Sequence, residues 1–185
     1  GAMSALGFAK RLDVFIVQLV RLLRDGKEVK MSKRAGTYVT IEEVLDEVGL
    51  DAARFFFLMH SQHTHMDFNL DLAKEQSEKN PVYYVQYAHA RMASIMKKTK
   101  RLPTKKSPEP PQTAELALVK ILLYFPDLIR EVASSYEVQK IPFFALDLAR
   151  AFSDFYSTCR VIDAEVVITS RLHLVEATKK VLAEE

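Results

Sequence analysis

The stretch "PFFALDLARAFSDFYST", residues 142–158, decides the fold of the second half of the chain. Its apolar residues Phe144, Leu148, Phe152 and Phe155 recur at spacings of three and four, which places them on one face of a helix. Pro142 lies at the start, where a proline is tolerated because that N–H has no partner in the helix. The segment therefore predicts an amphipathic helix that buries one face against other helices.

The segments on either side carry further helix signals. Asn80 and Pro81 form an N-cap followed by proline at the first helical position, which predicts a helix from there to about Lys98. Other helices are expected over 113–124, 127–138 and 171–183. We expect 101–112, which is rich in proline, to be a surface linker and 161–170 to be irregular. Residues 79–185 are thus predicted to form an all-α bundle.

Residues 1–78 have a mixed pattern that predicts a small α+β segment. Residues 13–23 are rich in Val, Ile and Leu and predict a strand, and 24–26, "RDG", predict a hairpin turn. "TIEE" at 40–43 has the capping-box pattern of a helix that stops at Gly49. A second, deeply buried helix is expected with Asp51 as its cap, then a loop or short strand over 60–72 and a short helix over 71–79. The fold class is therefore mainly α.

Composition excludes some classes of protein. Of the 185 residues, 49% are hydrophobic and 27% charged, and no apolar run reaches the roughly 20 residues that cross a bilayer. The first residues lack the pattern of a signal peptide. A single cysteine, Cys159, excludes an internal disulfide and fits a reducing cytoplasm, where we expect a buried, inert thiol. Residues 1–78 hold 10 Lys or Arg against 12 Asp or Glu, and the remainder holds 16 against 12, an excess too modest to establish nucleic-acid binding.

The stretch "KMSKRAG", 30–36, gathers Lys30, Lys33 and Arg34 on a loop after the predicted hairpin. Lysine is a compact charge on a flexible stem, so two lysines three residues apart suit a polyphosphate. The same spacing fits a plain surface loop whose lysines favour solubility. Charge spacing alone favours the plain surface loop over the polyphosphate site.

One face of the helix after Asn80 carries a second candidate site. Asn80, Tyr84, Tyr87 and Arg91 fall at i, i+4, i+7 and i+11, which aligns two aromatic rings and a guanidinium. Such a face can stack splayed RNA bases and hold their phosphates. The tyrosines could equally pack against neighbouring helices with their hydroxyl groups at the surface.

Other chemically suggestive residues are given structural interpretations. His60, His63 and His65 lack the fourth ligand that zinc needs, so no metal site is predicted. Surface and capping roles are expected for a set of carboxylates at four-residue spacing, and His89, off the tyrosine face, is expected to be a satisfied structural histidine. The carboxylates are Asp67, Asp71 and Glu75.

Several longer runs resemble one family, the bacterial arginyl-tRNA synthetases. "VKMSKRAGTYVTIEEVLDEVGLDAARFFFL" and "HMDFNLDLAKEQSEKNPVYYVQYAHAR" carry the resemblance, and Lys30-Met31-Ser32-Lys33 is similar to the KMSKS signature of class I synthetases. "FFALDLARAFSDFYSTCRV" looks like the family's helical anticodon-binding domain, of the type called DALR. The resemblance implies the end of a catalytic domain and a stem-contact fold over 1–78, then an anticodon-binding domain over 79–185.

The resemblance also implies roles for residues. Lys30 and Lys33, the implied catalytic residues, would contact ATP phosphates, with Met31 and Ser32 positioning the loop. Contact with the tRNA anticodon is implied for residues of the "YxQYAHxR" pattern and the cap before it: Asn80, Tyr84, Gln86, Tyr87 and Arg91.

The partners implied are arginine tRNA for this chain, and arginine and ATP with Mg²⁺ only for the full-length cytoplasmic enzyme. The chain lacks a His-x-Gly-His-type motif, so we expect a C-terminal fragment that neither adenylates arginine nor binds a cofactor alone. Two alternatives stay open: a stand-alone RNA-binding or scaffolding module, and another class I synthetase such as the cysteinyl type. Apolar surface left by a missing catalytic domain would favour self-association.

Overall fold

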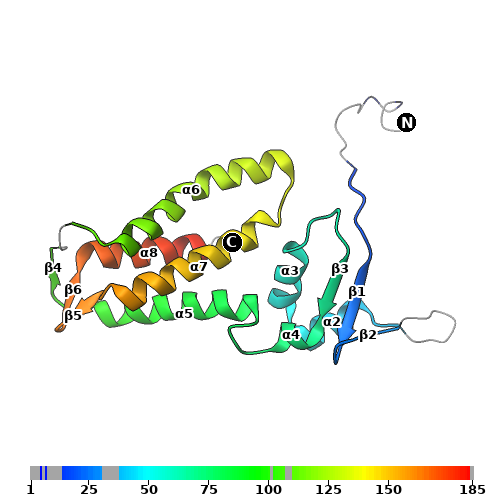
Figure 1. Cartoon of the computed structure of the whole chain (residues 1–185), viewed down its shortest axis with the longest axis horizontal. Coiled ribbons are helices and arrows are strands. Elements are labelled where there is room, and N and C mark those ends of the chain that lie inside the picture. The colour runs from blue at the N-terminus through cyan, green and yellow to red at the C-terminus, as the bar shows by residue number, and fades with distance from the viewer. Residues whose placement is uncertain are drawn as a thin grey trace.

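The computed structural model describes Ala5, Gly7 and residues 14–30, 38–100, 102–106 and 110–183. Figure 1 shows a small α/β part joined to a bundle of longer helices. The elements in chain order are β1 (Val20–Arg24), β2 (Lys27–Glu28), α2 (Ile41–Val48), α3 (Leu50–Leu58), β3 (Met66–Asn69), α4 (Leu70–Lys74), α5 (Pro81–Thr99), β4 (Thr104–Lys105), α6 (Thr113–Ser135), α7 (Lys140–Thr158), β5 (Ile162–Asp163), β6 (Val166–Ile168) and α8 (Thr169–Ala183). The prediction of a mainly α fold is confirmed.

The first sheet has the order β2-β1-β3, with β1 antiparallel to β2 and parallel to β3. The predicted hairpin is present: Asp25 and Gly26 both have positive φ, as a two-residue turn of type I′ requires. The strand is shorter than predicted, because residues 14–19 are extended but outside the ladder. This sheet, with α2, α3 and α4, encloses a small core that includes Leu22, Val44, Phe56 and Phe68.

Helices α2 and α3 begin and end at local signals. The Thr40 hydroxyl accepts from the Glu43 N–H and the Glu43 carboxylate accepts from the Thr40 N–H, so the predicted capping box is confirmed. Gly49 ends α2 and also precedes α3 without a side-chain cap, so the prediction of Asp51 as the cap was wrong. Helix α3 buries Ala52, Ala53 and Phe56 but leaves Phe57 and Leu58 partly exposed, so it is less deeply buried than predicted.

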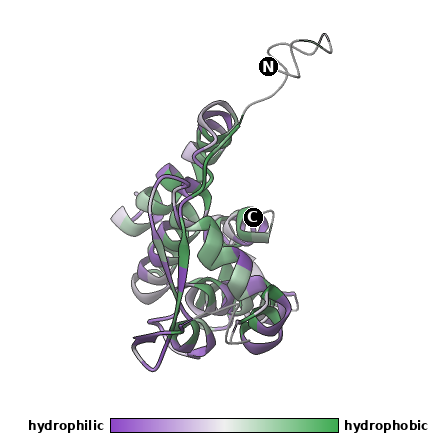
Figure 2. Cartoon of the chain, turned by 90° about the vertical axis from the view of Figure 1, so that its right-hand side faces the viewer, coloured by the Kyte–Doolittle hydropathy of each residue, from purple (hydrophilic) through white to green (hydrophobic). Residues whose placement is uncertain are grey.

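The bundle core is formed by α5, α6, α7 and α8. The apolar stripe of α7 is buried as predicted, since Phe144, Leu148, Phe152 and Phe155 are all inaccessible or nearly so. Met92 of α5 is fully buried in the same core. Other large residues that are fully or almost fully buried there are Leu118, Leu148, Phe152, Phe155 and Val175. In Figure 2 hydrophobic and hydrophilic residues alternate along the helices, as in amphipathic helices.

A single helix, α6, replaces the two helices predicted over 113–124 and 127–138. It runs through Pro126, although an internal proline removes one backbone hydrogen bond and costs about 3 kcal/mol. Leu118 lies before the proline, and Leu128 and Val132 lie after it; all three are buried in the bundle core. Packing on both sides of Pro126 therefore holds the helix continuous.

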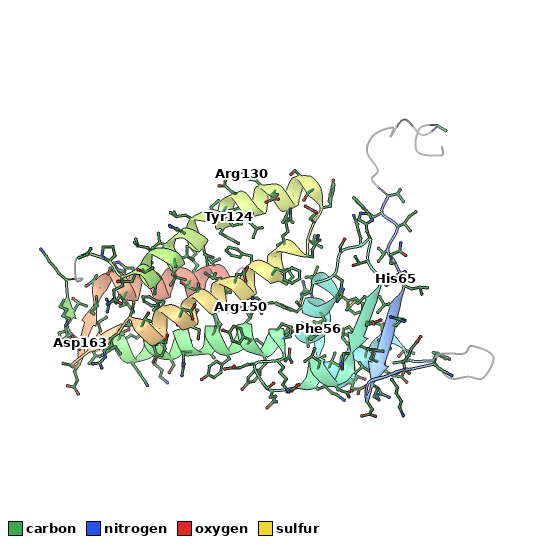
Figure 3. The ribbon with its side chains drawn as sticks, viewed as in Figure 1. Phe56, His65, Tyr124, Arg130, Arg150 and Asp163 are labelled. Carbon is green, nitrogen blue, oxygen red and sulfur yellow. The ribbon has the colours of Figure 1, made fainter. Side chains whose placement is uncertain are left out.

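The far end of the bundle carries a second small sheet of order β4-β6-β5. The predicted linker thus contains a strand, β4, which pairs in parallel with β6, and the segment predicted to be irregular forms the antiparallel pair β5–β6. The prediction of a linker failed because β4 pairs through Thr104 with Val167, a residue far away in the sequence. The β5–β6 pair is a local hairpin, whose turn residues Ala164 and Glu165 both have positive φ. In Figures 1 and 3 this sheet, marked by Asp163, lies at the opposite end of the bundle from β1 and β3.

The predicted domain boundary between residues 78 and 79 stays a prediction, although α5 begins close to it and packs into the bundle core.

Val14, Ile16, Val17 and Leu19 are strongly exposed in the extended segment before β1. Among the helices of the described ranges, none combines the length and the apolar character needed to cross a membrane.

His89 of α5 was predicted to be a satisfied histidine, and this prediction was wrong. Its Nε2 atom is buried and has no hydrogen-bond partner among the described residues. Burial lowers the pKa of His89 below its ordinary value of 6.5, and the charge of Lys179 on α8 lowers it further. Both effects disfavour the charged form of His89.

We expect the bundle to lose stability on mild acidification because of His89. A base whose folded-state pKa is depressed is protonated more readily in the unfolded chain, so the free energy of unfolding falls as pH drops below about 6.5. Urea unfolding at pH 7.5 and pH 5.5 should show a smaller acid loss for His89→Leu than for the unsubstituted chain. His173→Gln, which changes an exposed histidine of α8, is the control; an unchanged acid loss in His89→Leu would contradict this account.

Candidate RNA-binding site

Asn80 fixes the start of α5. Its Oδ1 atom accepts a hydrogen bond from the Val82 N–H at 3.0 Å, as predicted for an N-cap. Its amide nitrogen donates to the carbonyl oxygens of Ala73, at 3.1 Å, and Glu75, at 2.9 Å. The residue is only 4% exposed, so its side chain serves the fold and presents no group to a ligand.

The guanidinium of Arg91 lies between two tyrosine rings at the surface. Its Cζ atom is 5.3 Å from the ring centroid of Tyr87, one helical turn earlier, and 4.9 Å from that of Tyr156 on α7. Tyr87 is 51% exposed and Tyr156 39%. Each cation–π contact at such a site stabilises the arrangement by about 0.5–1 kcal/mol. We call these three residues the Tyr–Arg platform.

Two pockets flank the platform, and all three platform residues line both of them. The distal pocket, of about 590 Å³, extends toward the end of α7 and is lined additionally by Ala90, Ser94, Ile95, Lys98, Cys159, Arg160, Val161 and Ile162. The proximal pocket, of about 420 Å³, extends toward the start of α5 and is lined additionally by Gln76, Ser77, Glu78, Tyr83, Tyr84, Ala88, Ala149, Phe152 and Ser153. The platform therefore has open space on two sides for planar groups.

The electrostatic character of the distal pocket suits an anion. Arg91, Lys98 and Arg160 supply three cations to it, and none of its described lining residues is acidic. Cys159 is buried as predicted, and its thiol donates to the Gln112 Oε1 atom at 3.0 Å. The pocket thus combines aromatic faces with three cations and no acidic lining residue.

The structure brings together some, not all, of the residues predicted for this face. Tyr84 is half-buried; it lines the proximal pocket and packs on the bundle core, so both interpretations of it hold in part. Gln86 points elsewhere, because its Nε2 atom donates to Asp51 of α3 at 3.4 Å. Tyr84, Tyr87 and Arg91 share one surface, whereas Asn80 and Gln86 lie outside it.

Sequence reasoning missed four residues of the site. Ser94 and Lys98 continue the face of Arg91 by three and seven residues, so the helical period could have found them. Tyr156 follows Phe152 by four residues on the edge of the α7 stripe, and its ring stacks on Phe152 with a centroid distance of 6.0 Å. Arg160 lies beyond the end of α7 and has no such signal.

A buried ion pair fixes the backbone beneath Arg160. Arg171 of α8 donates through Nε to Glu115 Oε1 at 3.1 Å and through Nη1 to the Arg160 carbonyl oxygen at 2.9 Å. Glu115 also accepts from the Gln112 N–H at 2.8 Å, which caps α6. Both charged side chains are 5% exposed. The pair therefore ties the starts of α6 and α8 to the rim of the distal pocket.

The other predicted sites are only partly covered by the described residues. Lys30 is exposed just after Val29, whose N–H donates to the Leu22 carbonyl oxygen, while Met31, Ser32 and Lys33 lie outside the described residues. No group of three or more His, Cys, Asp or Glu side chains that could hold a metal ion occurs within the described ranges. Asp67 pairs with Arg21, and Asp71 accepts from the Asp25 N–H, as expected for surface and capping roles.

An exposed arginine between two tyrosines, with further cations beside it, is a combination of groups that proteins use to bind single-stranded nucleic acids. The chain belongs to the DALR anticodon-binding domain family, whose model matches residues 85–185.

Two relatives with similar sequences carry the name arginine–tRNA ligase. The chain is 46% identical to an arginine–tRNA ligase of Moorella thermoacetica and 46% identical to one of Symbiobacterium thermophilum, over 97% and 93% of its length. It spans about a third of these relatives, 34% and 32% of their lengths.

Two solved structures are similar to this chain. One, a candidate arginyl-tRNA synthetase from Campylobacter jejuni, matches with a TM-score of 0.81 and 28% identity over 98% of this chain and 40% of that one. The other, the Thermus thermophilus arginyl-tRNA synthetase, matches with a TM-score of 0.57 and 27% identity over 82% of this chain and 27% of that one.

Removing one partner of the buried ion pair should destabilise the bundle strongly. Arg171→Met leaves the Glu115 carboxylate buried without its cation, so we expect a loss of about 3–5 kcal/mol in the free energy of unfolding. The double variant Glu115→Leu/Arg171→Met should regain most of that loss, because no buried charge remains unpaired. Urea unfolding measures both, with Arg150→Ala, which breaks the exposed pair with Asp147, as the control expected to cost at most about 1 kcal/mol. A single variant no worse than this control would contradict the role of the pair.

Proposed function

We propose that this chain binds the anticodon loop of an arginine tRNA. The observation that supports it most is the Tyr–Arg platform, where an exposed guanidinium lies between the rings of Tyr87 and Tyr156. Unpaired bases can stack on the tyrosine faces from the two flanking pockets, and Lys98 and Arg160 supply charge to the phosphates beside them. Tyr84 contributes the edge of the proximal pocket.

We further propose that the complete protein is an arginine–tRNA ligase and that this chain is its C-terminal part. The relatives that support this carry the name arginine–tRNA ligase, and the activity proposed is esterification of arginine to tRNA through arginyl adenylate, with ATP and Mg²⁺. In that protein Lys30 and Lys33 would neutralise ATP phosphates during adenylate formation, with Met31 and Ser32 shaping the loop. The described residues supply no cluster that fits Mg²⁺, so no metal ligand is assigned to this chain. We also propose a cytoplasmic location for the complete protein, as expected of this activity.

The exposed apolar segment before β1 supports a proposal about assembly. Val14, Ile16, Val17 and Leu19 are exposed apolar residues close together in the sequence, and their exposure would favour self-association of the isolated chain. Sedimentation velocity over a concentration series tests this, and a constant monomer would contradict it.

The role of the lysine loop is tested in the complete ligase by exchange of labelled pyrophosphate into ATP. Lys33→Ala should slow the exchange by about 10²–10³-fold, by analogy with removing one preorganised donor from a transition state. Lys27→Ala, which removes an exposed lysine of β2, is the matched control and should retain activity. The 185-residue chain alone should give no exchange; robust exchange by it would contradict its assignment as a tRNA-binding part.

Binding of arginine tRNA tests the platform directly. Tyr87→Ala and Arg91→Ala should each weaken binding by about 1–3 kcal/mol, because each removes a stacking surface or the cation beside it. The matched controls are Tyr124→Ala, an exposed tyrosine of α6, and Arg150→Ala, an exposed arginine of α7; neither lines a platform pocket. Both residues are marked in Figure 3.

The same measurement separates the alternatives. Tighter binding of arginine tRNA than of other tRNAs, lost in the Tyr87 and Arg91 variants, supports anticodon binding by this face. Equal affinity for all tRNAs before and after substitution would overturn it and leave a general RNA-binding or scaffolding module.

A further inference from the structure

A third pocket, which we call the end groove, lies at the end of the bundle that carries the small sheet. It has a volume of about 520 Å³ and is lined by Lys105, Lys106, Gln112, Thr158, Arg160, Asp163, Ile168 and Arg171. Arg160 also lines the distal pocket, and the neighbouring residues Thr158 and Cys159 line the end groove and the distal pocket respectively. The two pockets are therefore adjacent across the end of α7.

The charges of the end groove divide into fixed and free cations. Lys105 pairs with Asp163 at 2.7 Å, and Arg171 is held by Glu115 in the buried pair described above. Lys106 is exposed and has no ion-pair partner among residues of the described ranges. The Arg160 side chain is 84% exposed and reaches Asp163 only at 4.0 Å. Lys106 and Arg160 can thus accept an external anion without breaking a strong contact.

The backbone on both sides of the end groove is held in place. On one side, β4 pairs with β6, and the Thr169 hydroxyl donates to the Lys105 carbonyl oxygen at 3.1 Å. On the other side, the Arg160 carbonyl oxygen accepts from the buried Arg171 guanidinium. A preorganised backbone limits the entropy lost when the two free cations close on a ligand.

We propose that the end groove binds the phosphodiester backbone of the single-stranded RNA segment adjoining the bases on the Tyr–Arg platform. The inference rests on the proposed function, since the platform defines where that RNA begins. Proteins that bind single strands combine stacking rings with a basic groove along the backbone, and the shared Arg160 joins those two features here. The described lining of the end groove contains no aromatic residue, so it suits phosphates and not bases. Lys106 and Arg160 are the residues that contact the phosphates.

The salt dependence of binding tests this groove. The 185-residue chain is titrated with the anticodon stem-loop of arginine tRNA at several salt concentrations. Each single-strand phosphate contact contributes about −0.7 to the slope of log affinity against log salt, so Lys106→Ala/Arg160→Ala should make the slope shallower by about 1.4. The control Lys120→Ala/Lys180→Ala removes two exposed lysines of α6 and α8 that line none of the three pockets, and should leave the slope near its original value.

The outcome distinguishes failure of the groove from failure of the platform. If Tyr87→Ala weakens binding while Lys106→Ala/Arg160→Ala leaves the slope unchanged, the platform stands and the groove proposal is overturned. If neither variant has an effect, both proposals fail. If Lys106→Ala/Arg160→Ala makes the slope shallower while Tyr87→Ala leaves the affinity unchanged, the groove binds RNA backbone and the platform proposal is the one that fails.

A second probe locates the contact on the RNA. Stem-loops carrying neutral methylphosphonate linkages at single loop positions should bind the unsubstituted chain more weakly at one or two positions. The same linkages should cause no further loss in Lys106→Ala/Arg160→Ala, because the cations that contact those phosphates are already absent from that variant. Fully additive losses would contradict a direct contact, and displacement of the stem-loop by millimolar inorganic phosphate would contradict a groove built for a polymer backbone.

Discussion

The packing of the apolar face of α7 against α5 and α6 is the constraint on which the rest of the bundle depends. Leu148, Phe152 and Phe155 are fully or almost fully buried, so the rotation of α7 about its axis is fixed. Tyr156 follows Phe155 by one residue, a turn of about 100°, which moves its ring from the core to the edge facing α5. There it meets Arg91, and the platform exists because a buried stripe on one helix sets the direction of an exposed ring beside it.

The parts of the fold that could be predicted from sequence are those set by neighbours in the chain. The Thr40 capping box, the Asn80–Pro81 helix start and the Asp25–Gly26 turn each rest on contacts within a few residues. The pairing of β4 with β6 could not be predicted, because β4 has only two residues and joins β6 across many residues of the chain. The β-branched run Val166–Ile168 of β6 is a local strand signal that the prediction of an irregular segment missed. The continuity of α6 through Pro126 also depends on tertiary burial, which outweighs the local signal of a proline.

The residues of the candidate site likewise fall into those that the sequence could predict and those that depend on tertiary contacts. The helical period alone places Tyr87 and Arg91 on one surface, and the structure agrees with that placement. The helical period also assigns Asn80 to this surface, but it gives no information about the hydrogen bonds of the side chain. The Asn80 amide already bonds to the Ala73 carbonyl oxygen and the Val82 N–H, so it has no group left to contact a ligand. Arg160 could not be found from sequence, because its position depends on the buried pair between Glu115 and Arg171, which joins residues of α6 and α8 beneath it.

The central claim is that RNA bases reach the Arg91 guanidinium and the two rings around it. The most direct measurement is an NMR titration of the chain, labelled with ¹⁵N at arginine side chains and ¹³C at tyrosine rings, with the anticodon stem-loop of arginine tRNA. We predict that the Arg91 Nε resonance and the ring resonances of Tyr87 and Tyr156 shift together and saturate at one equivalent, while those of Arg150 and Tyr124 stay in place. Saturable binding that leaves the three platform resonances unmoved would contradict the account.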